Sequence, residues 1–305
     1  MGTVIIGTEA VANGLITSHQ LRSRYRPLFP NVHAPSGIEP TLRDRTEGAW
    51  LWSRRAGVLT GMAASALHGA SWVDAAVDIE LVFNCTRPPH GIIARNERIT
   101  ADEWQRIGDL AVATPARTAF DLGRFRSHDA LARLDALMRA RPFSTADVMM
   151  LAERYRGARG FARLKAVLPL VDGGAESPRE SWWRHLVIAS GFPTPETQID
   201  VTDEFGGHVR RLDFGWRRYG VAVEYDGEHH QQDRAQYLKD RAVMPVLHRL
   251  GWHVIGVVRE DNPVAVLRRL HEVMTSRGWR GSIQIPRRAY AYAYAETAFR
   301  VPKTA

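Results

Sequence analysis

The chain is poor in cysteine and has no long, strongly apolar run. Cys85 is the only cysteine among 305 residues, which excludes an intramolecular disulfide and a zinc site built on several thiolates. Scarce cysteine suits a reducing cytoplasm. The most apolar window, AGVLTGMAASALHGASWV, is rich in alanine and glycine and predicts packed helices better than a membrane span. The start, MGTVIIGTEAVANG, lacks the basic segment that opens a signal peptide.

Lysine is also scarce, although the chain is basic overall. Lys and Arg together number 41 against 33 Asp and Glu, the formal net charge is +8, and only three of the basic residues are lysines. This excess favours a polyanionic partner, most simply nucleic acid. The alternative is an arginine-rich composition spread over every surface, since basic residues occur in both halves.

One segment, Leu170 to Pro178, separates two patterns of elements. We predict a mainly helical domain over 1–172, an α/β domain over 173–280 and a tail over 281–305. In the first domain a capping box at Thr17 and Gln20 predicts a short helix after Gly14. The other elements expected there are a β-ribbon within 22–35, a strand over 77–83, and helices over 41–54, 60–68, from 115, and over 127–140, 144–155 and 161–171.

The second domain is expected to fold as an α/β unit around a small mixed sheet. Its pattern predicts the order α-β-β-β-α-β-α. The expected helices cover 177–191, 235–250 and 263–277, and the strands cover 197–202, 208–216, 221–226 and 252–258.

Two carboxylates meet in the predicted hairpin of this domain. A two-residue turn at Arg218 and Tyr219 would place Asp213 directly opposite Glu224, with side chains about 5 Å apart. Asp226 would share their face, because same-face residues are two apart along a strand. Paired carboxylates repel each other, and a divalent cation such as Mg²⁺ resolves the conflict.

The alternative is that Asp226 pairs with Arg211 while Asp213 and Glu224 face solvent. The run VAVEYD disfavours this reading, because Val221 to Val223 are apolar on both faces and so predict a central strand.

The second domain resembles a known nuclease family. LDFGW, VAVEYDGEHH, a helix with Lys239-Asp240-Arg241, and LGWHVIGVV follow in order, as in the endonuclease domain related to very-short-patch-repair enzymes. That domain belongs to the PD-(D/E)XK superfamily, and the resemblance covers Glu176 to Arg277. It implies a restriction-endonuclease-like fold that cleaves DNA with Mg²⁺ or Mn²⁺. Asp213 and Glu224 would be the metal ligands, and the Tyr225 carbonyl would complete the site.

The sequence departs from the superfamily where the E-x-K lysine is replaced by Asp226. His229 and His230 just downstream would position or deprotonate the attacking water, or they are solvated loop residues. Lys239 or Arg241 would stabilise the pentavalent phosphate in place of the lost lysine, or they are ordinary surface charges.

Glu180 has two readings. The resemblance places an acid on the first helix near the metal, at the position of Glu180. The spacing from Ser177 is also that of a capping box, which would tie the Glu180 carboxylate to the Ser177 N–H. Glu176 is the nearby substitute. Trp182 and Trp183 on the same helix are expected to be packing residues.

The first domain more loosely resembles the antitoxin-like domain of AbiEi proteins. GLITSHQLR, RPLFPNVHAP and AWLWSRRAGVLTGMAASALHG carry the resemblance, which implies a winged helix-turn-helix at the start of the chain. Hardly any room remains after Leu21 to Arg26 for a second, recognition helix. The residues expected to contact nucleic acid are Arg22, Arg24, Arg26, Arg211 and Arg241, through phosphates and without sequence information.

These patterns together predict a metal-dependent DNA endonuclease acting in repair or defence, with no membrane partner and no disulfide-linked partner. The alternative is a DNA-binding regulator of antitoxin type whose nuclease fold does not cut. A nuclease acting on RNA has the same acidic residues.

Overall fold

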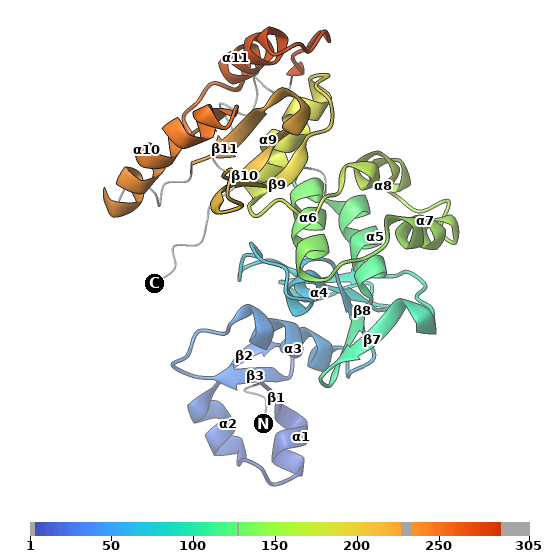
Figure 1. The fold of residues 1–305 in the computed structure, drawn as a ribbon. Coiled ribbons are helices and arrows are strands. Elements are labelled where there is room, and N and C mark those ends of the chain that lie inside the picture. Colours follow the sequence, from blue (N-terminus) through green and yellow to red (C-terminus); the bar gives the residue numbers. More distant parts are fainter. Residues whose placement is uncertain (1–3, 127, 227–233, 288–305) are drawn as a thin grey trace. The chain divides into compact units, whose positions relative to one another are not determined.

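The chain divides into two compact units, Met1–Val171 and Asp172–Ala305. A computed structural model describes residues 4–126, 128–226 and 234–287 (Figure 1). The division falls within the segment from Leu170 to Pro178 in which the sequence predicts a boundary. Within the described ranges, every helix is too short or too polar to cross a membrane.

The first unit begins with two short helices and a β-hairpin. Their order is β1 (Ile5–Ile6), α1 (Gly7–Ala12), α2 (Ser18–Arg24), β2 (Tyr25–Phe29) and β3 (Val32–Pro35), and the strands form an antiparallel sheet in the order β1-β3-β2. The capping box predicted at Thr17 and Gln20 is confirmed, because each side chain accepts the other's backbone N–H.

A further short helix, α1, precedes the helix capped by Thr17, so two helices lie before the hairpin. No helix follows directly after α2, because β2 begins at Tyr25, and the small room that the sequence predicts after Arg26 agrees with this. The sequence does not predict α1, because this helix has only six residues and no side-chain cap at Ile6.

The rest of the first unit combines a sheet with helices. Its mixed five-stranded sheet has the order β6-β5-β4-β8-β7. The strands are β4 (Val58–Thr60), β5 (Ile79–Val82), β6 (Ile92–Arg95), β7 (Trp104–Ile107) and β8 (Leu110–Ala113). The helices are α3 (Leu42–Trp52), α4 (Gly61–Leu67), α5 (Pro115–Phe125), α6 (Ala130–Ala140), α7 (Thr145–Glu153) and α8 (Phe161–Val167). A mainly helical first half was therefore too simple a prediction. Of these five strands the sequence predicts β5 alone, within 77–83, and the other four, of three or four residues, are too short to show clear alternation.

A buried ion network joins α5 to neighbouring segments of the first unit. Arg117 is fully buried, its Nε donates to Asp121 Oδ2 at 3.0 Å, and its Nη1 donates to Glu103. Arg124 donates to the other Asp121 oxygen at 2.8 Å, and the Tyr155 hydroxyl donates to Glu103 at 2.7 Å. Buried charges are tolerated when they are paired and hydrogen-bonded, as they are here.

The second unit has the element order that the sequence predicts. It contains α9 (Pro178–Ala189), β9 (Glu196–Thr202), β10 (His208–Trp216), β11 (Val221–Tyr225), α10 (Arg234–Arg249), β12 (His253–Val257) and α11 (Pro263–Ser276). The sheet order is β12-β11-β10-β9, with β11 and β12 parallel and the other pairs antiparallel. The unit is therefore α/β with a small mixed sheet.

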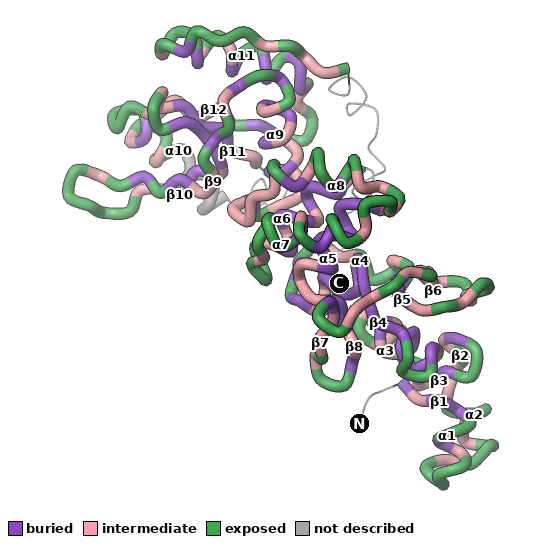
Figure 2. The backbone as a smooth tube through the Cα atoms, turned by 90° about the vertical axis from the view of Figure 1, so that its right-hand side faces the viewer, coloured by how far each residue is buried: buried purple, intermediate pink, exposed green. Residues whose placement is uncertain are grey.

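Helices cover both faces of this sheet. Val221 and Val223 belong to the core formed with α9 and α11, whereas Ala222 belongs to the core that contains Leu247 of α10. Strand β11 is thus buried on both sides, as its apolar run predicts. Figure 2 shows buried residues along these strands and exposed residues in the turn between β9 and β10.

The chain beyond α11 continues to pack on this unit. Ile283 and Ile285 contact its core, and the Gln284 N–H donates to the Ser190 carbonyl at 3.0 Å. A tail beginning at 281 therefore starts too early, because its first residues belong to the packed unit.

Candidate active site

The hairpin of β10 and β11 has the predicted register. Phe214 pairs with Val223 and Trp216 with Val221, so Asp213 and Glu224 are the next opposed residues. The connection is a 3-10 turn over Arg217–Tyr219 followed by Gly220 at φ 59°, where the sequence predicts a two-residue turn. Both connections give the same pairing.

Asp213 lies where the two strands stop pairing. The Tyr225 N–H donates to Asp213 Oδ2 at 2.7 Å, so this N–H of β11 is accepted by a side chain of β10 and not by a backbone carbonyl of β10. The ladder between β10 and β11 ends before this bond, at the pair of Phe214 and Val223. The Asp213 carboxylate is therefore held in the fork between the strands, only partly exposed.

The electrostatic environment disfavours the charged form of Asp213. Burial, and after it the carboxylates of Glu180 and Glu224, raise the pKa of Asp213 to about 7, although the Tyr225 hydrogen bond and Arg210 act to lower it. Near neutral pH this carboxyl group is therefore partly protonated, and a cation bound beside it would favour the ionised form.

Glu180 approaches this fork from the first turn of α9. It is 9% exposed, and its Oε2 accepts the Glu176 N–H at 2.8 Å. Ser177 Oγ accepts the Glu180 N–H at 3.2 Å, so the helix cap at Ser177 is present. The prediction that the Glu180 carboxylate binds the Ser177 N–H is wrong, because the N–H that it accepts is one residue earlier. From this position the negative charge of the Glu180 carboxylate raises the pKa of Asp213.

Sequence reasoning missed Arg210. Its Nε donates to Glu224 Oε1 at 2.7 Å, and the Glu224 side chain is only 14% exposed. The one signal in the sequence that could have indicated Arg210 is that a buried carboxylate needs a positive charge nearby. The register of β10 shifts between His208 and Arg210, and a sequence pattern does not reveal such a bulge.

The alternative pairing of Asp226 with Arg211 is wrong. The exposed Arg211 donates to Asp200 on β9 at 2.9 Å, and Asp213 and Glu224 do not simply face solvent. Asp226 is exposed directly after β11, and its N–H donates to the Val257 carbonyl at 2.8 Å.

Four other candidates cannot be placed. His229 and His230 lie outside the described residues. Lys239 and Arg241 lie on α10, in the part of that helix whose side chains are outside what the structure describes.

The donor set at the fork suits a hard divalent cation. In the described ranges, no three His, Cys, Asp or Glu side chains form a complete metal site. Mg²⁺ is usually bound by one or two carboxylates together with waters and substrate phosphates. Asp213 and Glu224, with the Tyr225 main chain beside them, match this requirement. Burial is the main cause of the raised pKa of Asp213, and the carboxylates of Glu180 and Glu224 add negative potential that a cation would offset.

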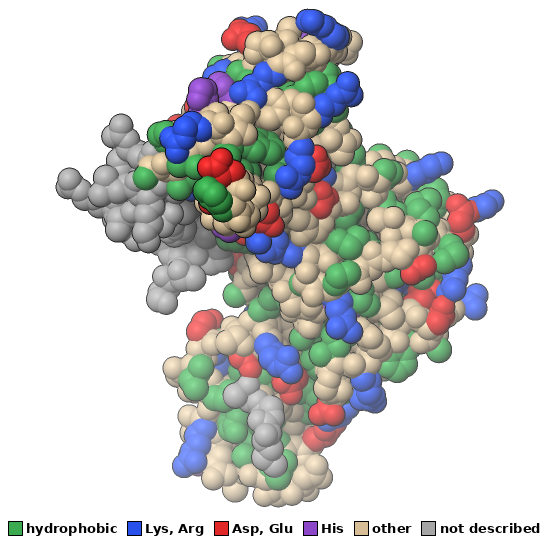
Figure 3. Space-filling view, in the orientation of Figure 1, with side chains coloured by type: hydrophobic (Ala, Val, Ile, Leu, Met, Phe, Trp, Pro, Cys, Tyr) green, Lys and Arg blue, Asp and Glu red, His purple; other side chains and the backbone are tan. Residues whose placement is uncertain are grey.

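The basic residues expected at the start of the chain are divided between two elements. Arg22 and Arg24 are exposed at the end of α2, whereas Arg26 on β2 forms an ion pair with Glu39 at 2.8 Å. Figure 3 shows Lys and Arg side chains scattered among acidic ones over the face drawn. The basic charge on that face is therefore dispersed.

Comparison with known proteins identifies relatives without an assigned activity. No protein-family profile matches the chain, and no solved structure matches it. Two uncharacterized proteins of Mycobacterium tuberculosis, one from strain CDC 1551 / Oshkosh and one from strain ATCC 25618 / H37Rv, are each 33% identical to it over 176 residues. That match covers 57% of this chain and 64% of each relative, so the chain spans just under two thirds of their length. The chain is similar to these two mycobacterial proteins over somewhat more than half of its residues.

Proposed function

We propose that the second unit is a metal-dependent nuclease that hydrolyses phosphodiester bonds in DNA. The observation that carries this proposal is the place of Asp213 in the strand fork, where it accepts the Tyr225 N–H at 2.7 Å and lies opposite Glu224. Glu180 and Glu224 are close enough to act on its carboxyl group. Clustered carboxylates repel one another and so destabilise a fold, and a bound divalent cation would offset this repulsion. The resemblance to PD-(D/E)XK nucleases, with a restriction-endonuclease-like fold, supports the same reading.

The chain's own groups would divide the work. Asp213 and Glu224 would hold Mg²⁺ or Mn²⁺, with the Tyr225 carbonyl as a further ligand. Such an ion lowers the pKa of bound water and offsets charge on the phosphate in the transition state. Glu180 would add negative potential, and Arg210 would hold Glu224 in place. Asp226, exposed directly after β11, and His229 and His230 are the candidates for orienting the attacking water.

The test is cleavage of plasmid, mismatched duplex, single-stranded DNA and RNA, each with Mg²⁺, with Mn²⁺ and with EDTA. We expect metal-dependent cleavage that is lost in Asp213→Ala and Glu224→Gln. Glu204→Gln is the matched control, because Glu204 is exposed in the turn between β9 and β10. Mg²⁺-dependent cleavage retained by Asp213→Ala would overturn the assignment, and cleavage of RNA alone would change the substrate.

Calorimetry gives a readout other than activity. An ion that binds Asp213 displaces its proton near neutral pH, so Mg²⁺ binding should release protons in the wild-type chain and not in Asp213→Asn. Equal proton release by both chains would place the ion elsewhere.

A second candidate function is DNA binding without cleavage, in a regulator of antitoxin type. It is favoured by the order β1-α1-α2-β2-β3 and by the exposed Arg22 and Arg24 on the second helix. Replacing both arginines by alanine should reduce the salt slope of duplex binding by roughly 1.8, at about 0.9 per phosphate contact. Arg87→Ala, at an exposed position of the same unit, is the control. Tight, salt-sensitive binding with no cleavage in any condition would favour the regulator.

A further inference from the structure

A strained backbone residue lies directly opposite Asp213 in the sheet of the second unit. Gln198 on β9 has φ 49°, in the left-handed region that favours glycine and that a long side chain rarely adopts. The ladder between β9 and β10 keeps the same register on both sides of Gln198, so no residue is inserted there and Gln198 stands opposite Asp213. The flanking pairs are Thr197 with Phe214 and Ile199 with Leu212.

Both strands change faces of the sheet at this level. Residues two apart along a strand normally share a face, and so do residues paired across two antiparallel strands. Leu212 and its partner Ile199 belong to the core beside α10, whereas Phe214, two residues after Leu212, belongs to the core formed with α9 and α11. The alternation of β9 and β10 is therefore reversed at Gln198 and Asp213.

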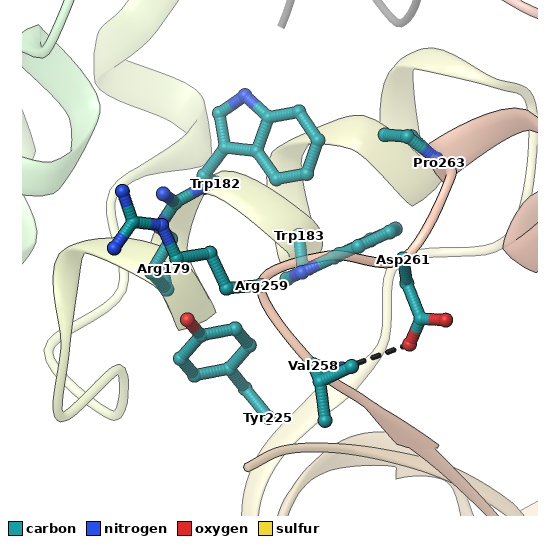
Figure 4. Close-up of a pocket in the computed structure, with 8 residues that line it drawn as sticks. All are labelled: Arg179, Trp182, Trp183, Tyr225, Val258, Arg259, Asp261 and Pro263. Carbon is teal, nitrogen blue, oxygen red and sulfur yellow. Dashed lines mark hydrogen bonds between the residues drawn. The ribbon is translucent and has the colours of Figure 1, made fainter. Parts of the chain in front are cut away.

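Strand β11 keeps a regular alternation to its end. Val221, Val223 and Tyr225 all pack on the core formed with α9 and α11. Figure 4 shows the Tyr225 ring pointing toward Arg179 of α9. Because β10 reverses its faces and β11 does not, the two strands part after the pair of Phe214 and Val223.

The reversal accounts for the sideways position of the Asp213 carboxylate. In a regular strand a side chain stands out of the sheet, but this carboxylate accepts the Tyr225 N–H of the neighbouring strand at 2.7 Å. Glu180 on α9 and Glu224 on β11 both act on it. By the alternation of β11, Glu224 lies on the face opposite to α9, so a carboxylate on either face would be separated by the sheet from one of these two groups. In the fork it is close to both.

Contacts on both sides of Gln198 hold its backbone in place. The Thr197 hydroxyl donates to the Asp172 carboxylate, with oxygen–oxygen distances of 3.0 and 3.2 Å. Gly174 lies so close to Thr197 that a methyl group on it would clash with this hydroxyl. On the other side, Ile199 is 1% exposed. Fixed neighbours of this kind can maintain a conformation that the residue itself disfavours.

We propose that Gln198 is a positioning residue whose left-handed backbone reverses β9 and β10 and so directs the Asp213 carboxylate into the fork. The proposal rests on the proposed function, because it takes Asp213 as a metal ligand. Gln198 acts through its backbone, and its side chain is not required. Glycine and asparagine, which adopt the left-handed conformation most readily, should therefore keep the site. A β-branched residue, which favours a regular extended strand, should lose it.

Hydrogen exchange at the Tyr225 amide tests the position of Asp213 without metal or substrate. Followed by NMR on the full chain, this amide should stay protected in Gln198→Gly and Gln198→Asn and should lose its protection in Gln198→Val. The Val223 amide lies between two paired strands and should stay protected in every variant, which shows that the unit is folded. If Gln198→Val does not fold, Gln198→Thr, which is β-branched and polar, takes its place.

Mn²⁺ binding, followed by electron paramagnetic resonance, tests the consequence for a metal ion. Gln198→Val should weaken binding by about 10- to 100-fold, the range for loss of a group that orients a metal ligand. Gln198→Gly and Gln198→Asn should bind as the wild type does. Thr202→Val is the matched control, because Thr202 is exposed on the same strand and does not have a positive φ.

Two results would overturn the positioning role: Tyr225 protection or Mn²⁺ affinity that is unchanged in Gln198→Val, or an equal loss in Gln198→Gly, which would assign the effect to the side chain. The same chains separate this role from the nuclease. Tyr225 protection that follows the series, in a wild type that binds no metal ion and cleaves nothing, would refute the nuclease and leave the positioning of Asp213. Asp213-dependent metal binding that is unchanged in Gln198→Val would refute the positioning role alone.

Discussion

Replacing Asp213 by asparagine should stabilise the second unit near pH 8. Burial and the neighbouring Glu180 and Glu224 raise the pKa of this carboxyl group from 3.8 to about 7. Each pKa unit corresponds to 1.36 kcal/mol, so the ionised group costs about 4 kcal/mol at most, and solvent at the partly exposed side chain reduces this figure. Asparagine carries no charge, and its amide oxygen can still accept the Tyr225 N–H.

The stabilisation should depend on pH in a defined direction. Between pH 3.8 and about 7 the folded chain holds a proton on Asp213 that the unfolded chain has lost. The wild-type free energy of unfolding therefore falls by up to about 1.4 kcal/mol for each pH unit across this window, relative to the variant. The advantage of Asp213→Asn is fully present above pH 7 and disappears near pH 4.

Urea unfolding followed by tryptophan fluorescence from pH 5 to 8.5 measures this difference, with Glu204→Gln as the exposed carboxylate control. Adding Mg²⁺ at pH 8 should stabilise the wild type and not Asp213→Asn, because a ligand stabilises only the folded state that binds it. A variant less stable than the wild type at pH 8, or a difference that does not change with pH, would refute the electrostatic reasoning.

Further predictions concern single positions. Arg210→Gln should move the pH midpoint of the fork carboxylate upward, because Arg210 lowers that pKa; Arg211→Gln, on the solvent side, should leave the midpoint unchanged in the same titration. Gly160→Ala should destabilise the first unit more than Gly108→Ala in thermal unfolding: both glycines have positive φ, which costs about 1–2 kcal/mol for alanine, but only at Gly160 would the added methyl group clash with a carbonyl oxygen of α5. Arg117→Met should cost about 3–5 kcal/mol in urea unfolding, because it leaves buried carboxylates without their partner, and a cost below 1 kcal/mol would show that the ion network contributes little.

The element order of the second unit was largely predictable, because short stretches of its sequence indicate where each helix and strand begins or ends. The apolar run at Val221 to Val223 predicts a central strand, and Gly191 and Gly251 close two of its helices at positive φ. The register that sets Asp213 opposite Glu224 also follows from the short connection between their strands.

The partners of the carboxylates were not predictable in the same way. Arg210 donates to Glu224 from a position next to a register shift of β10, and Glu180 accepts a backbone N–H one residue away from the expected one. In the first unit, β4 and β8 have three and four residues and pair in parallel at Leu59 and Val112, which lie far apart in the chain. Such contacts depend on tertiary packing, which a short window of sequence does not encode.

The ion network around Arg117 has a consequence for how the first unit opens. Its members come from segments between Glu97 and Tyr155, and Arg117, Glu103 and Asp121 are each at most 1% exposed. Detaching one segment would leave a charge in the interior without its partner, so partial opening is costly. The amide hydrogens of α5, of the 3-10 turn over Ala101–Glu103 and of the segment that follows α7 should therefore exchange with solvent together, as one cooperative unit.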